Sequence, residues 1–294
     1  MANSQAHVFE RSGVAALSDL QAEEWNTIYS LLEKDQSEFL AKEDRFRSPD
    51  YKWPRDPLHT WSRVWEYPYT YHHLKQWRDS GKNTEAALHA IDLGSGVTFF
   101  PFSVAKLGYQ VTCVDIDPIV SGDLSKVVRI IDQRPGQVDC RVCDNSNLPF
   151  MDGEVDAVYC VSVLEHVSDF ENTIDEVFRV LKIGGLFILT MDLDSSGHLD
   201  IGVDRYYELR KCLAKHFRMK GPEITVHPLD MLQPRNGPFP YKTYSSWQVH
   251  LFHIRQRIKM FLGQKPLDYY RLPNLDLAIW GAVMTKGSRV QTLR

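Results

Sequence analysis

Residues 90–98 read Ala-Ile-Asp-Leu-Gly-Ser-Gly-Val-Thr, a short apolar run that ends at an acid and then turns through two glycines. Glycine lets the backbone turn tightly and lets a ligand approach the main chain. Thr98 can cap a following helix, and Pro101 is tolerated in that helix's first turn. The stretch predicts a strand, a turn and a helix, with a ligand over the helix N-terminus. A plain strand–helix turn without a ligand is the alternative that this motif alone leaves open.

A second acid narrows the class of ligand. Residues 111–115 read Val-Thr-Cys-Val-Asp, and the carboxylate of Asp115 stands about 20 residues past the glycines, where it can accept hydrogen bonds from two ribose hydroxyls. Phe99 stands where the dinucleotide fingerprint has its third glycine, and its large ring hinders the approach of a pyrophosphate. Asp92 suits an ammonium group better than a pyrophosphate. The two acids therefore favour an adenosine ligand other than NAD.

From residue 88 onward, short apolar runs alternate with helical segments. We expect strands at 90–93, 110–114, 138–142, 157–160 and 186–191, with helices at 101–107, 119–132 and 170–181. Further elements are expected as a helix at 205–217, a strand at 223–226, a helix at 246–262 and a strand at 277–285. This alternation predicts an α/β fold, a Rossmann-like doubly wound and mostly parallel sheet.

Several further motifs follow in chain order, and together they are more specific than any one of them. They are Asp92–Gly96, Val114–Asp117, Cys143–Asn145, Leu148–Phe150, Val163–Val167 and Val177–Gly185. In this order they resemble the motifs of a class I S-adenosylmethionine-dependent methyltransferase, of the kind described as type 11. Thr98 departs from the pattern, because many members have a third glycine there.

The resemblance implies a cofactor and a set of residues that bind it. The cofactor is S-adenosylmethionine, with its methionine end at Asp92–Gly96, its ribose at Asp115 and its adenine amino group at Asp144. Arg63 lies outside the region that carries the resemblance, and we expect it to meet the cofactor carboxylate because of its charge. The expected cofactor-binding residues are Asp92, Gly94, Ser95, Gly96, Asp115, Ile116, Asp144, Asn145, Val161 and Arg63.

A base is expected where an oxygen or nitrogen accepts the methyl group. His166 follows the fourth strand of the sheet, near the expected position of the methyl group, and Asp192 follows the fifth strand with His198 close behind. We expect His166, Asp192 and His198 to be the catalytic residues. The alternatives are that they shape the pocket, cap a loop, or bind a divalent metal.

No metal site is expected. The spacing Cys140-x-x-Cys143 is that of a zinc ligand pair, but the pair falls in a probable strand and no second pair has suitable spacing.

The first 85 residues differ from the rest. We expect a helical cap over residues 1–85 and the methyltransferase domain over 86–294, with a helical lid inserted at about 230–270. A helix should run from Ser18 or Asp19 to about Ala41, and Pro68 should break a later helix. The aromatic cluster between them either closes over the cofactor, where rings attract a sulfonium, or packs the cap on the core. Its members are Trp65, Tyr67, Tyr69, Tyr71, His72 and His73.

Composition sets limits on location and partners. The net charge is −4, and the apolar stretches are far shorter than the roughly 20 residues of a membrane-spanning helix. No secretory signal is evident and five cysteines are an odd number, so we expect a reduced, cytoplasmic protein. Residues 201–265 hold 12 Lys and Arg against 4 Asp and Glu, which suits an anionic acceptor, weak membrane-surface contact or an ordinary solvated face. No nucleic-acid partner is expected, and the oligomeric state stays open.

The expected activity is methyl transfer from S-adenosylmethionine to a hydroxyl or amine of a small metabolite or sugar, because the cap suits a small, dehydrated ligand. Three alternatives remain open from the sequence. They are an NAD-dependent oxidoreductase on the same scaffold, a catalytically silent binding protein, and methylation of RNA or protein.

Overall fold

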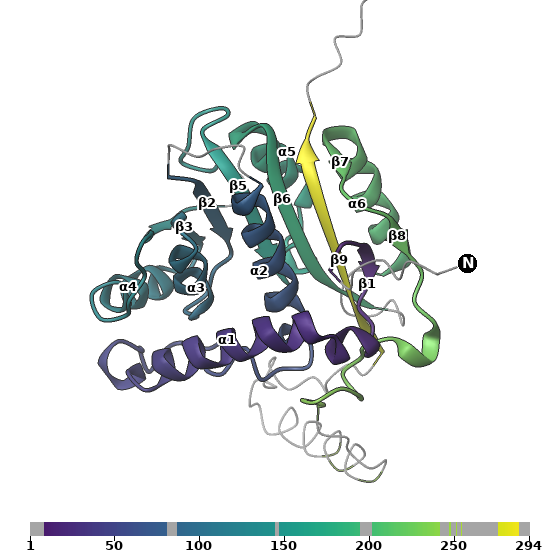
Figure 1. The fold of residues 1–294 in the computed structure, drawn as a ribbon, viewed down its shortest axis with the longest axis horizontal. Coiled ribbons are helices and arrows are strands. Elements are labelled where there is room, and N and C mark those ends of the chain that lie inside the picture. Colours follow the sequence, from purple (N-terminus) through teal and green to yellow (C-terminus); the bar gives the residue numbers. More distant parts are fainter. Residues whose placement is uncertain are drawn as a thin grey trace, which may run out of the picture.

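The structure is a computed structural model that describes residues 9–80, 87–144, 147–194, 202–241 and 276–287, and three single residues at 247, 251 and 254. Its centre is a twisted sheet in the order β4-β3-β2-β5-β6-β9-β1-β8, with β7 also paired to β9 (Figure 1). The strands are β1 (Ser12–Val14), β2 (His89–Leu93), β3 (Gln110–Asp115), β4 (Gln137–Val142), β5 (Val155–Val161), β6 (Leu181–Asp194), β7 (Phe217–Met219), β8 (Glu223–Ile224) and β9 (Leu277–Lys286).

Five neighbouring strands, β4, β3, β2, β5 and β6, are parallel, and β9 runs antiparallel to β6. The order reverses between β2 and β5, and this is the switch point at which open α/β sheets bind ligands. The prediction of a Rossmann-like, mostly parallel α/β fold is confirmed. All five strands expected between residues 90 and 191 are present; four are slightly longer than expected, and the strand expected at 186–191 extends over Leu181–Asp194.

Helices cover both faces of the sheet (Figure 1). One apolar cluster joins α1, α2, α3 and α4 to the sheet, and a second joins α5 and α6 to its other face. Successive residues of β2 alternate between them, since Ala90 belongs to the first cluster and Ile91 to the second. The helices are α1 (Glu23–Leu40), α2 (Arg63–Asp79), α3 (Phe100–Lys106), α4 (Pro118–Val127), α5 (Phe170–Val180) and α6 (Val203–His216).

The prediction that Pro68 breaks a helix is wrong, because α2 continues through it. Proline has no N–H to donate to the carbonyl four residues earlier, which here is that of Val64. The indole N–H of Trp25 on α1 donates to this carbonyl oxygen over 3.0 Å. A side chain from another helix therefore satisfies the acceptor that Pro68 leaves open.

The N-terminal segment is not purely helical. Strand β1 pairs with β9 and β8 at the far edge of the sheet, and the expected first helix splits into a 3₁₀ turn, Ser18–Gln21, followed by α1. Asp19 caps neither helix. Its buried carboxylate instead binds the guanidinium of Arg11 at 2.5–2.6 Å and accepts the indole N–H of Trp65 over 2.9 Å. The N-terminal segment is thereby fixed to α2.

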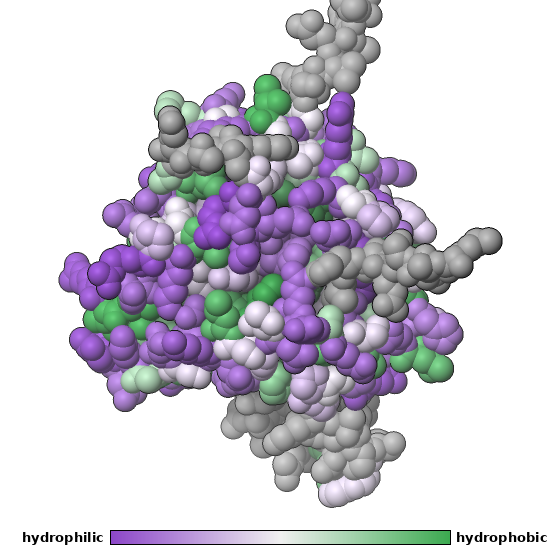
Figure 2. All heavy atoms as spheres, in the orientation of Figure 1, coloured by the Kyte–Doolittle hydropathy of each residue, from purple (hydrophilic) through white to green (hydrophobic). Residues whose placement is uncertain are grey.

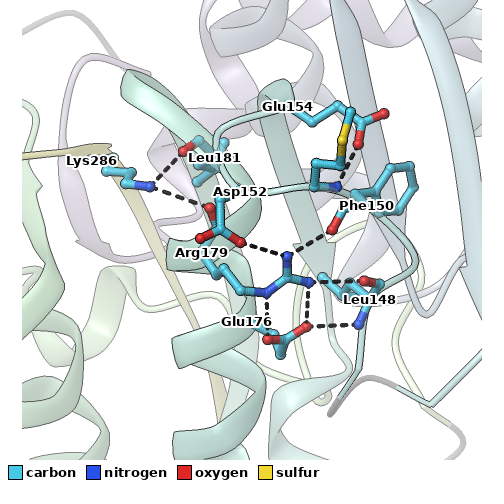
Figure 3. A network of polar contacts seen from close by, with 9 residues as sticks. Leu148, Phe150, Asp152, Glu154, Glu176, Arg179, Leu181 and Lys286 are labelled. Carbon is cyan, nitrogen blue, oxygen red and sulfur yellow. Dashed lines mark hydrogen bonds and ion pairs between the residues drawn. The ribbon is translucent and has the colours of Figure 1, made fainter.

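Arg179 near the end of α5 holds the loop that leads into β5 (Figure 3). Its guanidinium donates to the carbonyl oxygens of Leu148 and Phe150 over 2.9 and 2.7 Å, and pairs with Glu176 and Asp152. This side chain therefore fixes the path of the chain just after the third expected motif of the cofactor site.

The surface over α1 and α2 is largely hydrophilic, with hydrophobic residues gathered in small patches (Figure 2). Among the helices that the structure describes, none is long and apolar enough to cross a membrane. Most of the helix expected at 246–262, and with it most of the expected lid at about 230–270, lies outside the described residues.

Candidate active site

A cavity of about 730 Å³ opens at the carboxyl ends of β2, β3, β5 and β6. Its volume falls in the usual range for small-molecule sites. Eleven of the thirteen residues expected at the site line it, and they are Arg63, Asp92, Gly94, Ser95, Gly96, Asp115, Ile116, Asp144, Val161, His166 and Asp192. The other two, Asn145 and His198, lie outside the described residues.

The glycine turn forms one wall of the cavity. Gly94 has a φ of +73°, and a Cβ on it would lie 2.5 Å from a methyl carbon of Val163. Gly96 has a φ of +54°, and its N–H donates to the carboxylate of Asp115 over 3.0 Å. The turn therefore needs glycine at both positions, and Asp115 fixes its shape as well as facing the cavity.

The expected cap at Thr98 is wrong. Helix α3 begins at Phe100, and its N-terminus makes no side-chain capping hydrogen bond. Thr98 is buried and lines the cavity together with Tyr67 of α2. The glycine turn and the N-terminal region therefore both contribute to this wall.

Two acids, the buried Asp92 and the half-buried Asp115, face the cavity with different surroundings. Burial raises the pKa of Asp92 to about 8. Burial also raises the pKa of Asp115, against the opposing effect of the backbone N–H groups of Asp117 and Gly96. An ammonium group beside Asp92 would favour its ionised form, while Asp115 already accepts two N–H groups at 2.9 and 3.0 Å.

A third group of polar residues closes the cavity beside β5. Arg63 on α2 donates from Nη1 to Glu66 and, over 2.6 Å, to the hydroxyl of Ser162. The same hydroxyl donates to Glu66 over 2.8 Å. The sequence predicted Arg63 here but missed Glu66 and Ser162, since neither stands in a motif.

The residues expected to act as bases lie near the ends of β5 and β6. His166 is in the 3₁₀ turn after β5, whereas Asp192 lies inside β6, two residues before its end, and does not follow the strand as expected. His166 and Asp192 both line the cavity. The backbone N–H of Asp192 donates to the buried carboxylate of Glu165 over 3.2 Å, and burial raises the pKa of that carboxyl. Glu165 thus connects the loop after β5 with the end of β6.

The remaining wall comes from the segment between α1 and α2, which the sequence did not single out. Tyr51, Trp53, Pro57 and Trp61 line the cavity, together with Tyr241. Trp61 and Tyr241 meet edge to face, with ring centroids 6.4 Å apart. The available signal was the joint occurrence of prolines and tryptophans in this loop.

Of the aromatic cluster that was expected to close over the cofactor or pack the cap, only Tyr67 lines the cavity. The other members are buried, and Trp65 stacks on Tyr69 with 4.4 Å between ring centroids. A Cβ on Gly281 of β9 would lie 2.7 Å from the Trp65 ring. Packing of α2 on the sheet is therefore the main role of this cluster.

The polar groups that line the cavity match the polar groups of the expected cofactor. The cavity offers carboxylates for an ammonium and a diol, and the buried hydroxyl of Ser95, which has no hydrogen-bond partner among the described residues. Within the same part of the chain, no group of three or more His, Cys, Asp or Glu side chains is arranged to hold a metal ion.

Comparison with known proteins assigns the class. Residues 91–189 match the family described as "Methyltransferase domain". This region is a class I S-adenosylmethionine-dependent methyltransferase domain. Its cofactor is S-adenosylmethionine.

Several curated relatives carry the description "Ubiquinone biosynthesis O-methyltransferase". The protein of Xanthomonas axonopodis pv. citri (strain 306) is 34% identical over 158 residues, which cover 51% of this chain and 60% of that protein. The protein of Xanthomonas oryzae pv. oryzae (strain PXO99A) is 33% identical over 157 residues, with the same coverage. The chain thus spans about three fifths of the length of the curated relatives it matches.

Solved structures of similar shape include phosphoethanolamine N-methyltransferase 2 of Haemonchus contortus in complex with S-adenosyl-L-methionine. It is 16% identical, with a TM-score of 0.46, over 85% of this chain and 60% of that one. The YcgJ protein from Bacillus subtilis is 15% identical, with a TM-score of 0.47, over 74% of this chain and 99% of that one.

Proposed function

We propose that this protein transfers a methyl group from S-adenosylmethionine to a hydroxyl or amine of a small metabolite or sugar, with a hydroxyl favoured. The curated relatives are named as O-methyltransferases, which supports oxygen as the acceptor atom. The observation that carries the proposal is one cavity that joins the expected cofactor residues to an aromatic wall from residues 51–63.

Each proposed cofactor-binding residue suits a particular group of S-adenosylmethionine. Asp92 suits the ammonium group, and Arg63 the carboxylate. The hydroxyl of Ser95, which has no partner among the described residues, suits a polar group of the ligand at the start of α3, and Asp115 suits the ribose hydroxyls. The acid at Asp144 suits the adenine amino group. Ser95, Ile116 and Val161 complete the lining of this part of the cavity.

When bound, S-adenosylmethionine would supply a methyl group on a positively charged sulfur; the acceptor atom would bond to the methyl carbon as the carbon–sulfur bond breaks, with S-adenosylhomocysteine as the leaving group. The protein's own contribution is to position the acceptor, exclude water and take up its proton. Trp53, Pro57 and Trp61 provide apolar surface that excludes water. His166 and Asp192, which reach the cavity from two neighbouring strand ends, are the proposed bases.

Calorimetric titration with S-adenosylhomocysteine, and with NADH in parallel, tests the cofactor. We expect micromolar binding of the first and none of the second. Binding of NADH alone would overturn the proposal in favour of hydride chemistry. Transfer of labelled methyl groups to a panel of small hydroxyl and amine acceptors then tests the reaction, and binding without turnover on any acceptor would favour a silent binding protein.

RNA is tested in the same assay. Methylation of RNA that falls with rising salt, in proportion to phosphate contacts, would replace the small acceptor by a nucleic acid. Protein substrates are tested by adding unfractionated protein as the acceptor. The proposal expects neither to be methylated above background.

Asp115→Ala tests the ribose contact. A hydrogen bond to a charged group contributes roughly 1.5–3 kcal/mol, so the affinity for S-adenosylhomocysteine should fall about ten- to a hundredfold. Asp35→Ala serves as a control, because Asp35 binds Ser103 and Lys106 on α3 and does not line the cavity. Unchanged affinity in folded Asp115→Ala protein would contradict the assignment of Asp115.

A further inference from the structure

Arg63, Glu66 and Ser162 form a closed triangle of hydrogen bonds at the edge of the cavity. Arg63 donates to both partners, and Ser162 donates to Glu66 over 2.8 Å. Glu66 is completely buried, whereas the side chain of Arg63 remains 23% exposed. A fully buried carboxylate requires partners of this kind, and its position between the two fixes both.

Ser162 holds an unusual backbone conformation. Its φ is +49°, in the left-handed region that residues with a side chain rarely adopt. It lies between Val161 and Val163, which both line the cavity, and its N–H donates to the carbonyl of Thr190 over 2.9 Å. Strained residues of this type persist where the surroundings fix them, and they gather at functional sites. The contacts with Arg63 and Glu66 are the side-chain part of that restraint.

We propose that Glu66 and Ser162 are positioning residues for the amino-acid end of S-adenosylmethionine and that they act through Arg63. The inference rests on the proposed function. Because Nη1 of Arg63 is occupied by Glu66 and Ser162, the N–H groups on Nε and Nη2 are left for a ligand. The planar guanidinium presents such pairs of donors in the spacing of a carboxylate, so fixing one nitrogen sets the direction of the rest.

The charge of Glu66 is as important as its geometry. Burial lowers the pKa of Arg63, but the carboxylate of Glu66, which compensates the guanidinium charge, raises it. Tyr67, Asp192 and Glu165 act in the same direction as Glu66, so that the pKa lies above its usual value. The cofactor carries an ammonium and a sulfonium, which an uncompensated guanidinium would repel. With Glu66 in place, Arg63 can bind the carboxylate through directed hydrogen bonds without opposing the two cationic groups.

The test compares two ligands by calorimetry. S-adenosylhomocysteine has the amino-acid end, whereas 5′-methylthioadenosine keeps the adenosine and the sulfur but lacks that end. In Glu66→Gln we expect the affinity for S-adenosylhomocysteine to fall about tenfold or more, and the affinity for 5′-methylthioadenosine to change less than about twofold. Arg63→Lys should give the same pattern, because it loses the fork of donors.

Ser162→Gly separates the side chain from the backbone. Glycine adopts a positive φ without strain, so this variant removes the hydroxyl while easing the turn. We again expect a selective loss of affinity for S-adenosylhomocysteine. Ser103→Ala is the matched control, since Ser103 is a buried serine that donates to Asp35 over 2.6 Å and does not line the cavity. It should leave the affinities for both ligands unchanged.

Two results would overturn the inference and leave the proposed function standing. One is an equal loss for both ligands in Glu66→Gln and Ser162→Gly, which would indicate general damage to the cavity. The other is unchanged affinity for S-adenosylhomocysteine in both variants when melting curves show that they are folded. Failure of the unsubstituted protein to bind either ligand would instead refute the proposed function itself.

Discussion

The indole N–H of Trp25 donates to the carbonyl oxygen of Val64 over 3.0 Å, at the point where Pro68 deprives that oxygen of its helical partner. Helix α2, which carries Arg63 and Tyr67 to the cavity, therefore depends on a residue of α1 for its continuity. This contact couples the folding of the N-terminal region to the geometry of the site.

Trp25→Phe should consequently destabilise the protein by about 1–3 kcal/mol, because a buried carbonyl loses its donor while most of the ring packing remains. Urea denaturation followed by fluorescence or circular dichroism measures the change. Tyr29→Phe is the control, since the Tyr29 ring stacks on Trp25 but its buried hydroxyl has no hydrogen-bond partner in the described part of the chain. Equal effects of the two substitutions would show that the Trp25 hydrogen bond contributes little.

The hydrogen bond between Trp25 and Val64 also shows which parts of the fold could not be predicted from the sequence. The sheet was predictable because apolar runs and glycine turns are local, and residues 90–98 alone defined the central strand and turn. The continuity of α2 through Pro68 was not predictable, because the Trp25 indole that donates to Val64 lies about 40 residues away in the sequence. For a similar reason strand β1 was missed: three residues make it a strand only through pairing with β9.

The residues of the site also divide into those that the sequence predicted and those that only the fold brings together. Asp92, Gly94, Gly96 and Asp115 stand in motifs and were predictable by their spacing. Glu66 stands in no motif, and only the fold brings it to Ser162. The aromatic wall at residues 51–61 was missed because a loop has no periodicity from which the direction of its side chains can be inferred.

Arg179 gives a second prediction about stability. Arg179→Lys should cost about 1–3 kcal/mol of the free energy of unfolding, because one ammonium cannot replace the fork that binds the carbonyls of Leu148 and Phe150 together with Glu176 (Figure 3). Chemical denaturation measures this. Arg134→Lys is the comparison, since Arg134 forms an exposed pair with Asp132, and a change there should be close to zero. Equally small effects of Arg179→Lys and Arg134→Lys would mean that the loop does not depend on the several donors of the guanidinium.

The acidity of Asp92 predicts how stability depends on pH. Its pKa in the folded protein is raised to about 8, so the folded state keeps a proton that the unfolded state has already lost above about pH 4. Its contribution to stability is therefore present below that value and is lost as the pH rises towards 8. In Asp92→Asn, the decline in melting temperature between pH 5 and 8 should be shallower.

The same group predicts how ligand binding depends on pH. Binding of an ammonium beside Asp92 favours the carboxylate, so S-adenosylhomocysteine should release protons near pH 7 and bind more tightly as the pH rises from 6 to 8. Calorimetry in buffers of different ionisation enthalpy counts the released protons, and the count should approach zero in Asp92→Asn. A pH-independent affinity in the unsubstituted protein would place the ammonium elsewhere.

Substitutions at His166 and Asp192 distinguish a base that takes the acceptor proton from a residue that only shapes the pocket. A general base typically contributes about 10²- to 10⁴-fold in rate, so His166→Gln should lower kcat by at least about a hundredfold if His166 takes the acceptor proton. The affinity for S-adenosylhomocysteine should then change little. If His166 is the base, Asp192→Asn should lower kcat in the same way only if the two residues act together, since both line one cavity. If His166→Gln weakens cofactor binding and leaves kcat intact, its role is to shape the pocket and Asp192 becomes the remaining candidate for the base.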